Sequence, residues 1–144
     1  MSCRVNSVTE FPKILIADRN RHVRELLRRE LNAEGYRVEL ARDGREVVNR
    51  IAGEDPPDLL ILDLELPYVD EVEVLARLAE RQPPLPVVIH TFMPEAANHP
   101  AVLQAAAFLE KKGDTDLLKA VVAEVLGKNC AQRPKTAPDR DEEE

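Results

Sequence analysis

Four polar residues stand where four separate apolar runs of this chain end, and their types suit chemistry at a charged ligand. They are Asp18, Asp63, Thr91 and Lys111. Carboxylates can ligate a divalent cation or act as nucleophiles, whereas a hydroxyl and an ammonium donate hydrogen bonds to anionic oxygens. A single aspartate or lysine after a strand is usually a turn residue or a solvated cation. Four such residues at four strand ends are harder to explain by loop chemistry, so we expect them to converge.

The apolar runs that precede these residues indicate buried strands. They cover 14–17, 59–62, 87–89 and 105–109. Unbroken apolar runs of this length are typical of strands that are covered on both faces, as in a parallel sheet. The segment 37–41 alternates apolar and polar residues instead, which favours an edge strand with one polar face.

Helical patterns separate the strands and complete an α/β alternation. Apolar stripes at helical spacing occur in 23–31, 47–51, 72–78 and 117–125, and a short helix is expected in 94–104. Gly35 is placed to end the first helix, and Asp114 or Thr115 to begin the last. We therefore predict a doubly wound fold with five parallel strands and five helices. In such sheets ligands bind beyond the carboxyl ends of the strands, where the four polar residues stand.

The two ends of the chain differ from its middle. We predict a flexible segment over 1–10, one domain over 11–127, and a disordered acidic tail over 128–144. The tail is rich in proline and charge and cannot bury enough apolar surface to offset its ordering entropy. A solubilising role and a partner-binding role are both open for it.

Composition excludes several other classes of protein. The formal net charge of −7 argues against binding to a nucleic-acid backbone, which needs clustered cations. No apolar run approaches the roughly 20 residues that span a bilayer, and no signal peptide is visible, so we expect a cytoplasmic protein with no membrane partner. Cys3 and Cys130 form neither a disulfide framework nor a metal-ligand spacing.

The four positions, taken with their neighbours, resemble the receiver domain of two-component response regulators over about 13–127. In that family the first strand ends in an acidic pair, and Asp18 takes its first position. The phosphoacceptor aspartate is followed four residues later by proline, as in Asp63-Leu64-Glu65-Leu66-Pro67. The fourth strand ends in threonine or serine, matched by Thr91, and the fifth carries an aromatic residue and a lysine, matched by Phe108-Leu109-Glu110-Lys111.

The resemblance implies a flavodoxin-like sheet of order 2-1-3-4-5 and phosphoryl transfer to Asp63 from a sensor histidine kinase or a phosphotransfer protein. It also implies Mg²⁺, held by Asp18, by Asp63 and by the backbone carbonyl of Glu65, whose side chain could supply a further carboxylate. The function implied is signalling by contact with a downstream protein, as a stand-alone receiver and not as an enzyme. A phosphodonor must reach Asp63, so the carboxyl of this residue is expected to be open to solvent.

The same resemblance assigns roles to three further residues. Lys111 pairs with one phosphoryl oxygen, and the Thr91 hydroxyl donates to another. Movement of Thr91 towards the phosphoryl group allows Phe108 to turn inward, which reshapes the surface of the fourth and fifth strands. Such an element is a two-state switch biased by a local charge.

Two departures from the family pattern affect the site. Arg19 replaces the second acidic residue of the pair, and a guanidinium, which has only donors, cannot ligate Mg²⁺. Arg19 either pairs with Asp63 and occupies the metal position, or points to solvent as the first residue of the following helix with Asn20 as N-cap. Phe92 stands where a small residue usually borders the path to the phosphoacceptor; it either narrows that path or packs outward.

Three functions are therefore compatible with the sequence. A working receiver is phosphorylated at Asp63, whereas a pseudo-receiver binds partners without phosphate because Arg19 weakens the metal site. A flavodoxin-like cofactor protein is disfavoured because Asp18-Arg19-Asn20 contains no glycine for a phosphate loop. His90, beside Thr91, is interpreted as a packed histidine and not as a phosphocarrier or a ligand.

Overall fold

The computed structural model describes residues 11–66, 85–92, 105–111 and 115–131, with side chains up to residue 127. Its elements are β1 (Lys13–Ala17), α1 (Arg21–Ala33), β2 (Arg37–Ala41), α2 (Gly44–Ala52), β3 (Leu59–Leu62), β4 (Val87–Thr91), β5 (Ala107–Glu110) and α4 (Asp116–Ala131). The five strands form one sheet of order β2-β1-β3-β4-β5, and all four neighbouring pairs are parallel. The predicted sheet and its strand order are confirmed.

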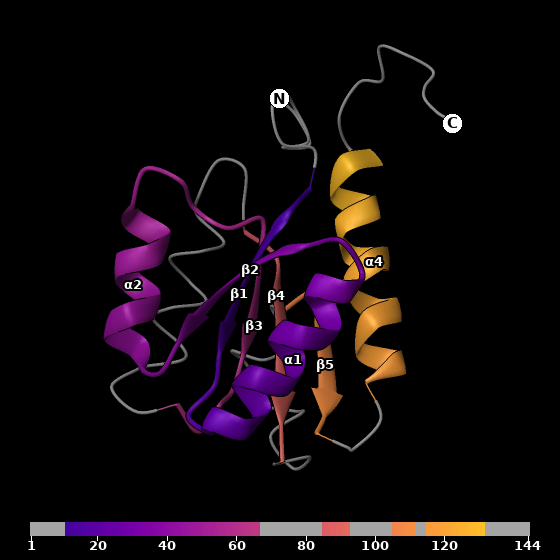
Figure 1. Ribbon diagram of the computed structural model, residues 1–144. Helices are drawn as coiled ribbons and strands as arrows, with labels where there is room; N and C mark the ends of the chain where they lie inside the picture. The colour runs from indigo at the N-terminus through magenta and orange to yellow at the C-terminus, as the bar shows by residue number, and fades with distance from the viewer. Residues whose placement is uncertain (1–10, 67–84, 93–104, 112–114, 132–144) are drawn as a thin grey trace.

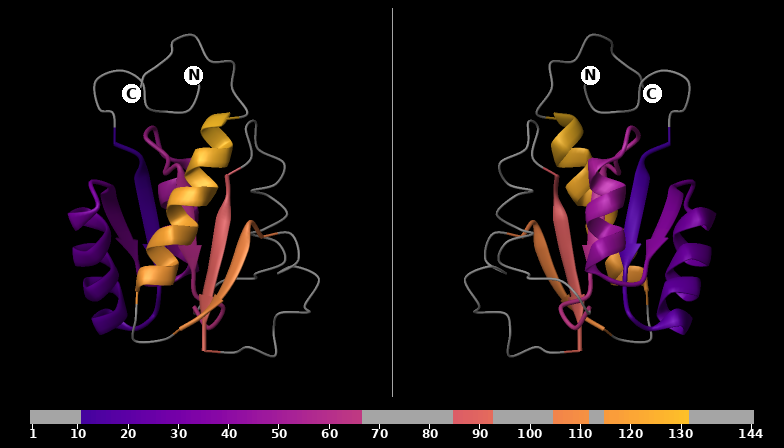
Figure 2. Two further views of the ribbon diagram at one scale, coloured as in Figure 1. Left: turned by 90° about the vertical axis from the view of Figure 1, so that its right-hand side faces the viewer. Right: turned by 90° about the vertical axis from the view of Figure 1, so that its left-hand side faces the viewer.

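The described helices cover both faces of this sheet. Figure 1 shows α2 on one side and α1 with α4 on the other, and the two side views of Figure 2 agree. Alternate residues of β1 enter different cores: Leu15 packs in the cluster that includes Val47 of α2, and Ile16 packs in the cluster with Leu27 of α1 and Val122 of α4. Coverage of both faces explains why the strand sequences are unbroken apolar runs.

The ends of α1 follow from local chemistry and fix the loop next to the predicted site. The Asn20 side chain accepts hydrogen bonds from the backbone N–H groups of His22 and Val23, and the helix begins at Arg21. An N-cap asparagine satisfies donors that the first turn leaves unpaired. Asn20 is thus the N-cap, as one of the two alternatives for Arg19 required, but Arg19 precedes the cap and is not part of the helix.

Gly35 ends the turn after α1 with a φ of 100°, a left-handed conformation that side chains with a Cβ rarely adopt. A Cβ at this position would lie 3.8 Å from two ring atoms of Phe11, which is an ordinary contact. The cost of Gly35→Ala is therefore backbone strain and not a clash. We expect this substitution to lower the free energy of unfolding by about 1–2 kcal/mol, measured by urea denaturation. An unchanged midpoint would contradict the strained φ.

Two predicted boundaries differ from the structure. The helix α4 continues through Ala131, so the first residues of the predicted disordered tail, 128–131, are helical. The last strand begins at Ala107 and not at the start of the apolar run at 105. Thr115 directly precedes α4. The other cap candidate, Asp114, and the helices predicted in 72–78 and 94–104 lie outside the described residues. None of the helices in the described part of the chain combines the length and apolarity needed to cross a bilayer.

Candidate functional site

The parallel pairing of the strands brings their carboxyl ends to one edge of the sheet. Ala17 pairs with Leu62 in the register of β1 and β3, so the next residues, Asp18 and Asp63, are neighbours across the two strands. The Asp63 N–H donates to the Ala17 carbonyl at 2.9 Å. At the other side, the Lys111 N–H donates to the carbonyl of Thr91 at 2.7 Å. The edge that the sequence predicts therefore carries all four polar residues.

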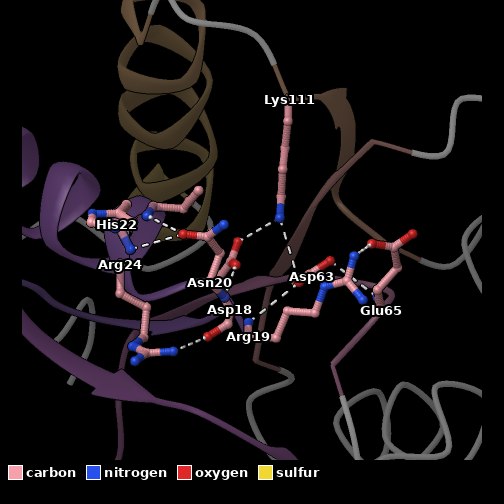
Figure 3. Close-up of polar contacts among 9 residues, drawn as sticks. Asp18, Arg19, Asn20, His22, Arg24, Asp63, Glu65 and Lys111 are labelled. Carbon is pink, nitrogen blue, oxygen red and sulfur yellow. Dashed lines mark hydrogen bonds and ion pairs between the residues drawn. The ribbon is translucent and has the colours of Figure 1, made fainter.

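Lys111 joins the two aspartates through its ammonium group. Its Nζ lies 2.7 Å from Oδ2 of Asp18 and 3.4 Å from Oδ2 of Asp63, as Figure 3 shows. The three side chains are 4%, 3% and 0% exposed, respectively. Charges so far from water need both a partner and hydrogen bonds to be tolerated. One ammonium and two carboxylates leave the buried centre with an excess of negative charge.

Backbone N–H groups from two loops supply the hydrogen bonds that the aspartates need. The Asn20 N–H donates to Asp18 Oδ1 at 2.8 Å, and this bond to the residue two positions earlier closes an Asx turn. The Glu65 N–H makes the same turn with Asp63 Oδ1 at 3.0 Å. Arg19 N donates across the loops to Asp63 Oδ2 at 3.4 Å. Each carboxylate oxygen of Asp63 thus accepts a hydrogen bond from a backbone N–H group.

Burial dominates the electrostatics of Asp18. Removal of its carboxylate from water raises the pKa of Asp18 above the ordinary value, and the nearby charge of Asp63 acts in the same direction. The hydrogen bonds from Lys111 and from Asn20 N–H oppose that rise without cancelling it. The ionised form of Asp18 is therefore less favourable in the fold than in the unfolded chain.

The side chain of Arg19 forms an ion pair with the carboxylate of Glu65. It does not pair with Asp63 through its guanidinium, and it does not point free into solvent, so neither predicted alternative describes it fully. Arg19 follows β1 and Glu65 follows β3, and the ion pair links these two loops beside Asp63 (Figure 3). The side chains of Arg19 and Glu65 are 52% and 24% exposed, which places them outside the buried aspartate.

Phe92 is 57% exposed, and its ring still contacts the site. The Nζ of Lys111 lies 4.9 Å from the centroid of the ring, within the range of a cation–π interaction. One face of the ring therefore borders the ammonium while much of the residue meets solvent, and the narrowing of the path to Asp63 by Phe92 stays a prediction.

The expectation that the Asp63 carboxyl is open to solvent is wrong for this conformation. Its side chain is 0% exposed. The described groups around it are the Lys111 ammonium, the backbone N–H groups of Arg19 and Glu65, and the ion pair that these two residues form. The ion pair between Arg19 and Glu65 joins residues that are 46 positions apart, so no local pattern of the sequence predicts it.

Two of the three predicted metal ligands lie together. The carboxylates of Asp18 and Asp63 approach the same ammonium and fit a Mg²⁺ ion, which proteins often bind through one or two carboxylates. The third predicted ligand, the backbone carbonyl of Glu65, stays a prediction, whereas the Glu65 carboxylate, which could have supplied a further ligand, pairs with Arg19. In the described part of the chain, no group of three or more histidine, cysteine, aspartate or glutamate residues is arranged to hold a metal.

Two further residues take the positions that the fold requires of them. Thr91 is the last residue of β4 and is fully buried. Phe108 in β5 is half-buried and packs against the core on the α2 side of the sheet. Arg24 was not predicted as a site residue, although its guanidinium donates to the backbone carbonyl of Asp18 at 2.7 Å; one arginine among several in α1 carries no signal of that contact.

Comparison with known families agrees with the geometry. The family described as "Response regulator receiver domain" matches residues 14–123, which is most of the chain. This chain belongs to the receiver domain family. Among the relatives of this receiver domain is "Response regulator MprA" of Mycolicibacterium vanbaalenii, which is 38% identical over 128 residues, covering 88% of this chain and 52% of the relative. The MprA of Mycobacterium bovis strain BCG is 42% identical over 95 residues, covering 66% of this chain and 41% of the relative.

Solved structures place the receiver domain among signalling proteins of the same fold. The response regulator TrrA of Thermotoga maritima, in complex with Mg²⁺-BeF, has a TM-score of 0.74 at 27% identity, covering 80% of this chain and 99% of TrrA. TrrA in complex with the histidine kinase ThkA has a TM-score of 0.72 at 28% identity, covering 81% and 99%. The chain spans about half the length of the curated relatives described above.

Proposed function

We propose that this receiver domain accepts a phosphoryl group on Asp63 and passes the signal by contact with another protein. The observation that carries the proposal is the lysine ammonium 3.4 Å from the Asp63 carboxylate, with a second carboxylate bound to the same ammonium. A fixed cation beside a carboxylate can neutralise the oxygens of an incoming phosphoryl group, and catalysis of phosphoryl transfer consists mainly of positioning and charge neutralisation.

In the proposed reaction a carboxylate oxygen of Asp63 attacks the phosphorus of a phosphohistidine on a histidine kinase or a phosphotransfer protein. The P–O bond forms as the P–N bond breaks, and the imidazole nitrogen keeps the bonding electrons and takes up a proton. Lys111 neutralises phosphoryl oxygens, and Thr91, at the end of β4, donates its hydroxyl to one of them. A bound Mg²⁺ on Asp18 and Asp63 would add positive charge at the same place.

The partner is proposed by similarity. TrrA, which is 28% identical to this chain over the matched residues, is known in complex with the histidine kinase ThkA. A sensor histidine kinase is therefore the partner class we propose for this receiver domain, followed by a downstream protein that recognises the phosphorylated form. The proposed change at that surface is a movement of Thr91 that allows the half-buried Phe108 to turn inward.

Incubation with acetyl phosphate and Mg²⁺ tests the phosphoacceptor role. We expect one added phosphoryl mass in the native chain and none in Asp63→Asn, because an amide is not a nucleophile of this type. Asp43→Asn is the matched control, since the Asp43 side chain caps α2 by accepting a hydrogen bond from the Glu46 N–H and asparagine caps equally well. The control should be labelled as the native chain is. Equal labelling of Asp63→Asn and the native chain would place the phosphoryl group elsewhere.

Two observations favour a second candidate function, a pseudo-receiver that binds partners without phosphate. Asp63 is fully buried, and Arg19 pairs with Glu65 where a metal-binding carboxylate is usual in the family. In that case neither acetyl phosphate nor Mg²⁺ with beryllium fluoride changes the native chain, and Arg19→Asp restores the response. Phosphoryl uptake by the native chain would support the working receiver and exclude the pseudo-receiver.

A further inference from the structure

We propose that the ion pair between Arg19 and Glu65 is a gate that decides which reagents reach Asp63. This inference deepens the proposed phosphoacceptor role of Asp63 and rests on it. The gate is defined as these two side chains, which leave the ends of β1 and β3 and meet beside the buried carboxylate (Figure 3).

The gate is built by the same two residues that hold the carboxylate. The backbone N–H of Arg19 donates to one oxygen of Asp63, and the backbone N–H of Glu65 donates to the other. The two residues are therefore anchored at different oxygens of the Asp63 carboxylate, and their side chains form an ion pair with each other. The ion pair ties the two loops together beside the carboxylate that an incoming group must reach.

Exposure falls steeply from the gate to the acceptor. The side chain of Arg19 is 52% exposed, that of Glu65 is 24% exposed, and that of Asp63 is 0% exposed. An ion pair at this exposure is weak, because water and salt screen it. The gate can thus open without unfolding the site, while the buried ammonium of Lys111 stays beside both aspartates.

The charge of the gate determines what opens it. Glu65 is the only described partner of the Arg19 guanidinium, and a phosphoryl group can compete for a guanidinium because it accepts two parallel hydrogen bonds. An approaching phosphohistidine therefore draws Arg19 away from Glu65 and exposes Asp63. A small neutral reagent offers Arg19 no such contact and meets a closed gate. Arg19 is in this way a specificity-determining residue that selects anionic donors.

Thiol labelling measures the gate without any phosphoryl transfer. In an Asp63→Cys chain, the rate of alkylation by neutral iodoacetamide reports access to position 63. The rate is followed from pH 6 to pH 10, and limiting thiolate rates are compared so that a changed thiol pKa does not enter. We expect Arg19→Ala and Glu65→Gln each to raise the limiting rate by about fivefold, the most that a surface ion pair usually contributes.

The matched control is Arg28→Ala in the same Asp63→Cys chain. Arg28 pairs with Glu25 on α1, and its side chain is 47% exposed, close to the exposure of Arg19. The control should leave the limiting rate unchanged. In Arg19→Ala/Glu65→Gln the rate should not exceed that of the faster single variant, because each single change already breaks the pair. Rates that multiply, or single variants as slow as the control, overturn the gate.

A second measurement keeps the test decisive if Asp63→Cys does not fold. Mg²⁺ titration of the chain with Asp63 intact, followed by the amide shift of Glu65, should show about fivefold tighter binding in Arg19→Ala than in the native chain. Equal affinities overturn the gate. If Arg19→Ala speeds alkylation but no chain takes up a phosphoryl group, the gate is retained and the receiver reaction is rejected. If the native chain takes up the phosphoryl group but Arg19→Ala changes neither the alkylation rate nor the Mg²⁺ affinity, only the gate is rejected.

Discussion

Replacement of Lys111 by methionine is expected to lower the free energy of unfolding by about 3–5 kcal/mol at pH 7. The reason is the burial of the site: the side chains of Asp18 and Asp63 are 3% and 0% exposed, and Lys111 is the cation that contacts both. Methionine keeps much of the volume of the lysine stem but leaves two carboxylates in a desolvated site. Urea denaturation followed by circular dichroism measures the loss.

A second substitution separates the charge from the packing. Asp18→Asn in the Lys111→Met chain removes one of the two stranded charges, and we expect it to recover at least half of the lost stability. Lys119→Met is the matched control, because Lys119 pairs with Glu30 where both side chains are partly exposed. Its effect should be far smaller. A Lys111→Met chain as stable as this control would show that the buried ion pairs do not form in solution.

The pH dependence of the Lys111→Met loss follows from the raised pKa of Asp18. A carboxyl whose pKa is higher in the folded chain binds more protons there than in the unfolded chain, between the folded pKa and the unfolded value of 3.8. Stability contributed by this group therefore increases as the pH falls through that interval. The hydrogen bond and the charge of Lys111 lower the pKa of Asp18, so the substitution should raise that pKa further, and the deficit of Lys111→Met should shrink as the pH falls through the higher pKa of the variant.

The elements that could be predicted from sequence are those whose signals are local. The apolar run 59–62 gave β3 with its bounds, because a strand covered on both faces requires a continuous apolar sequence. The N-cap role of Asn20 was similarly readable, since an N-cap bonds to residues two and three positions away. The family resemblance, not the apolar pattern, supplied the strand order that the structure confirms.

What could not be predicted depends on contacts between distant loops. Asp18, Asp63 and Lys111 were expected at one edge because parallel strands end together, and the lysine does contact both aspartates. The Arg19–Glu65 ion pair has no local signal, because many arginines and glutamates are available to each other in a chain that is 33% charged. The burial of the Asp63 carboxyl likewise depends on groups that the fold brings together, and no local sequence pattern carries it.

His90 is expected to make the fold sensitive to mild acid. The residue is 8% exposed, and its Nδ1 has no hydrogen-bond partner among the residues that the structure describes. Burial, together with the nearby charge of Lys111, lowers the pKa of His90 to about 4, although Asp63 acts in the opposite direction. The neutral imidazole is thus the form that the fold accepts, as the interpretation of a packed histidine required.

The direction of the effect follows from linkage. Because the folded pKa of about 4 lies below the ordinary value of 6.5, the unfolded chain binds more protons than the folded chain between these two pH values. Stability is therefore complete above pH 6.5 and falls as the pH decreases towards 4. The shift corresponds to about 3 kcal/mol at pH 4, at about 1.4 kcal/mol per pKa unit. Protonation of Asp18 acts in the opposite direction, so the native chain alone does not isolate the histidine.

Comparison of the native chain with His90→Leu isolates it. Leucine retains an apolar side chain of similar size in β4 and removes the unpaired Nδ1, so stability at pH 7.5 should change by no more than about 1 kcal/mol. Between pH 7.5 and pH 4 the native chain should lose about 3 kcal/mol more than His90→Leu, because every other titrating group is common to both. Urea midpoints over this pH range give the difference directly. Parallel stability curves for the two chains would mean that the imidazole is protonated in the folded state, with water or a partner at Nδ1.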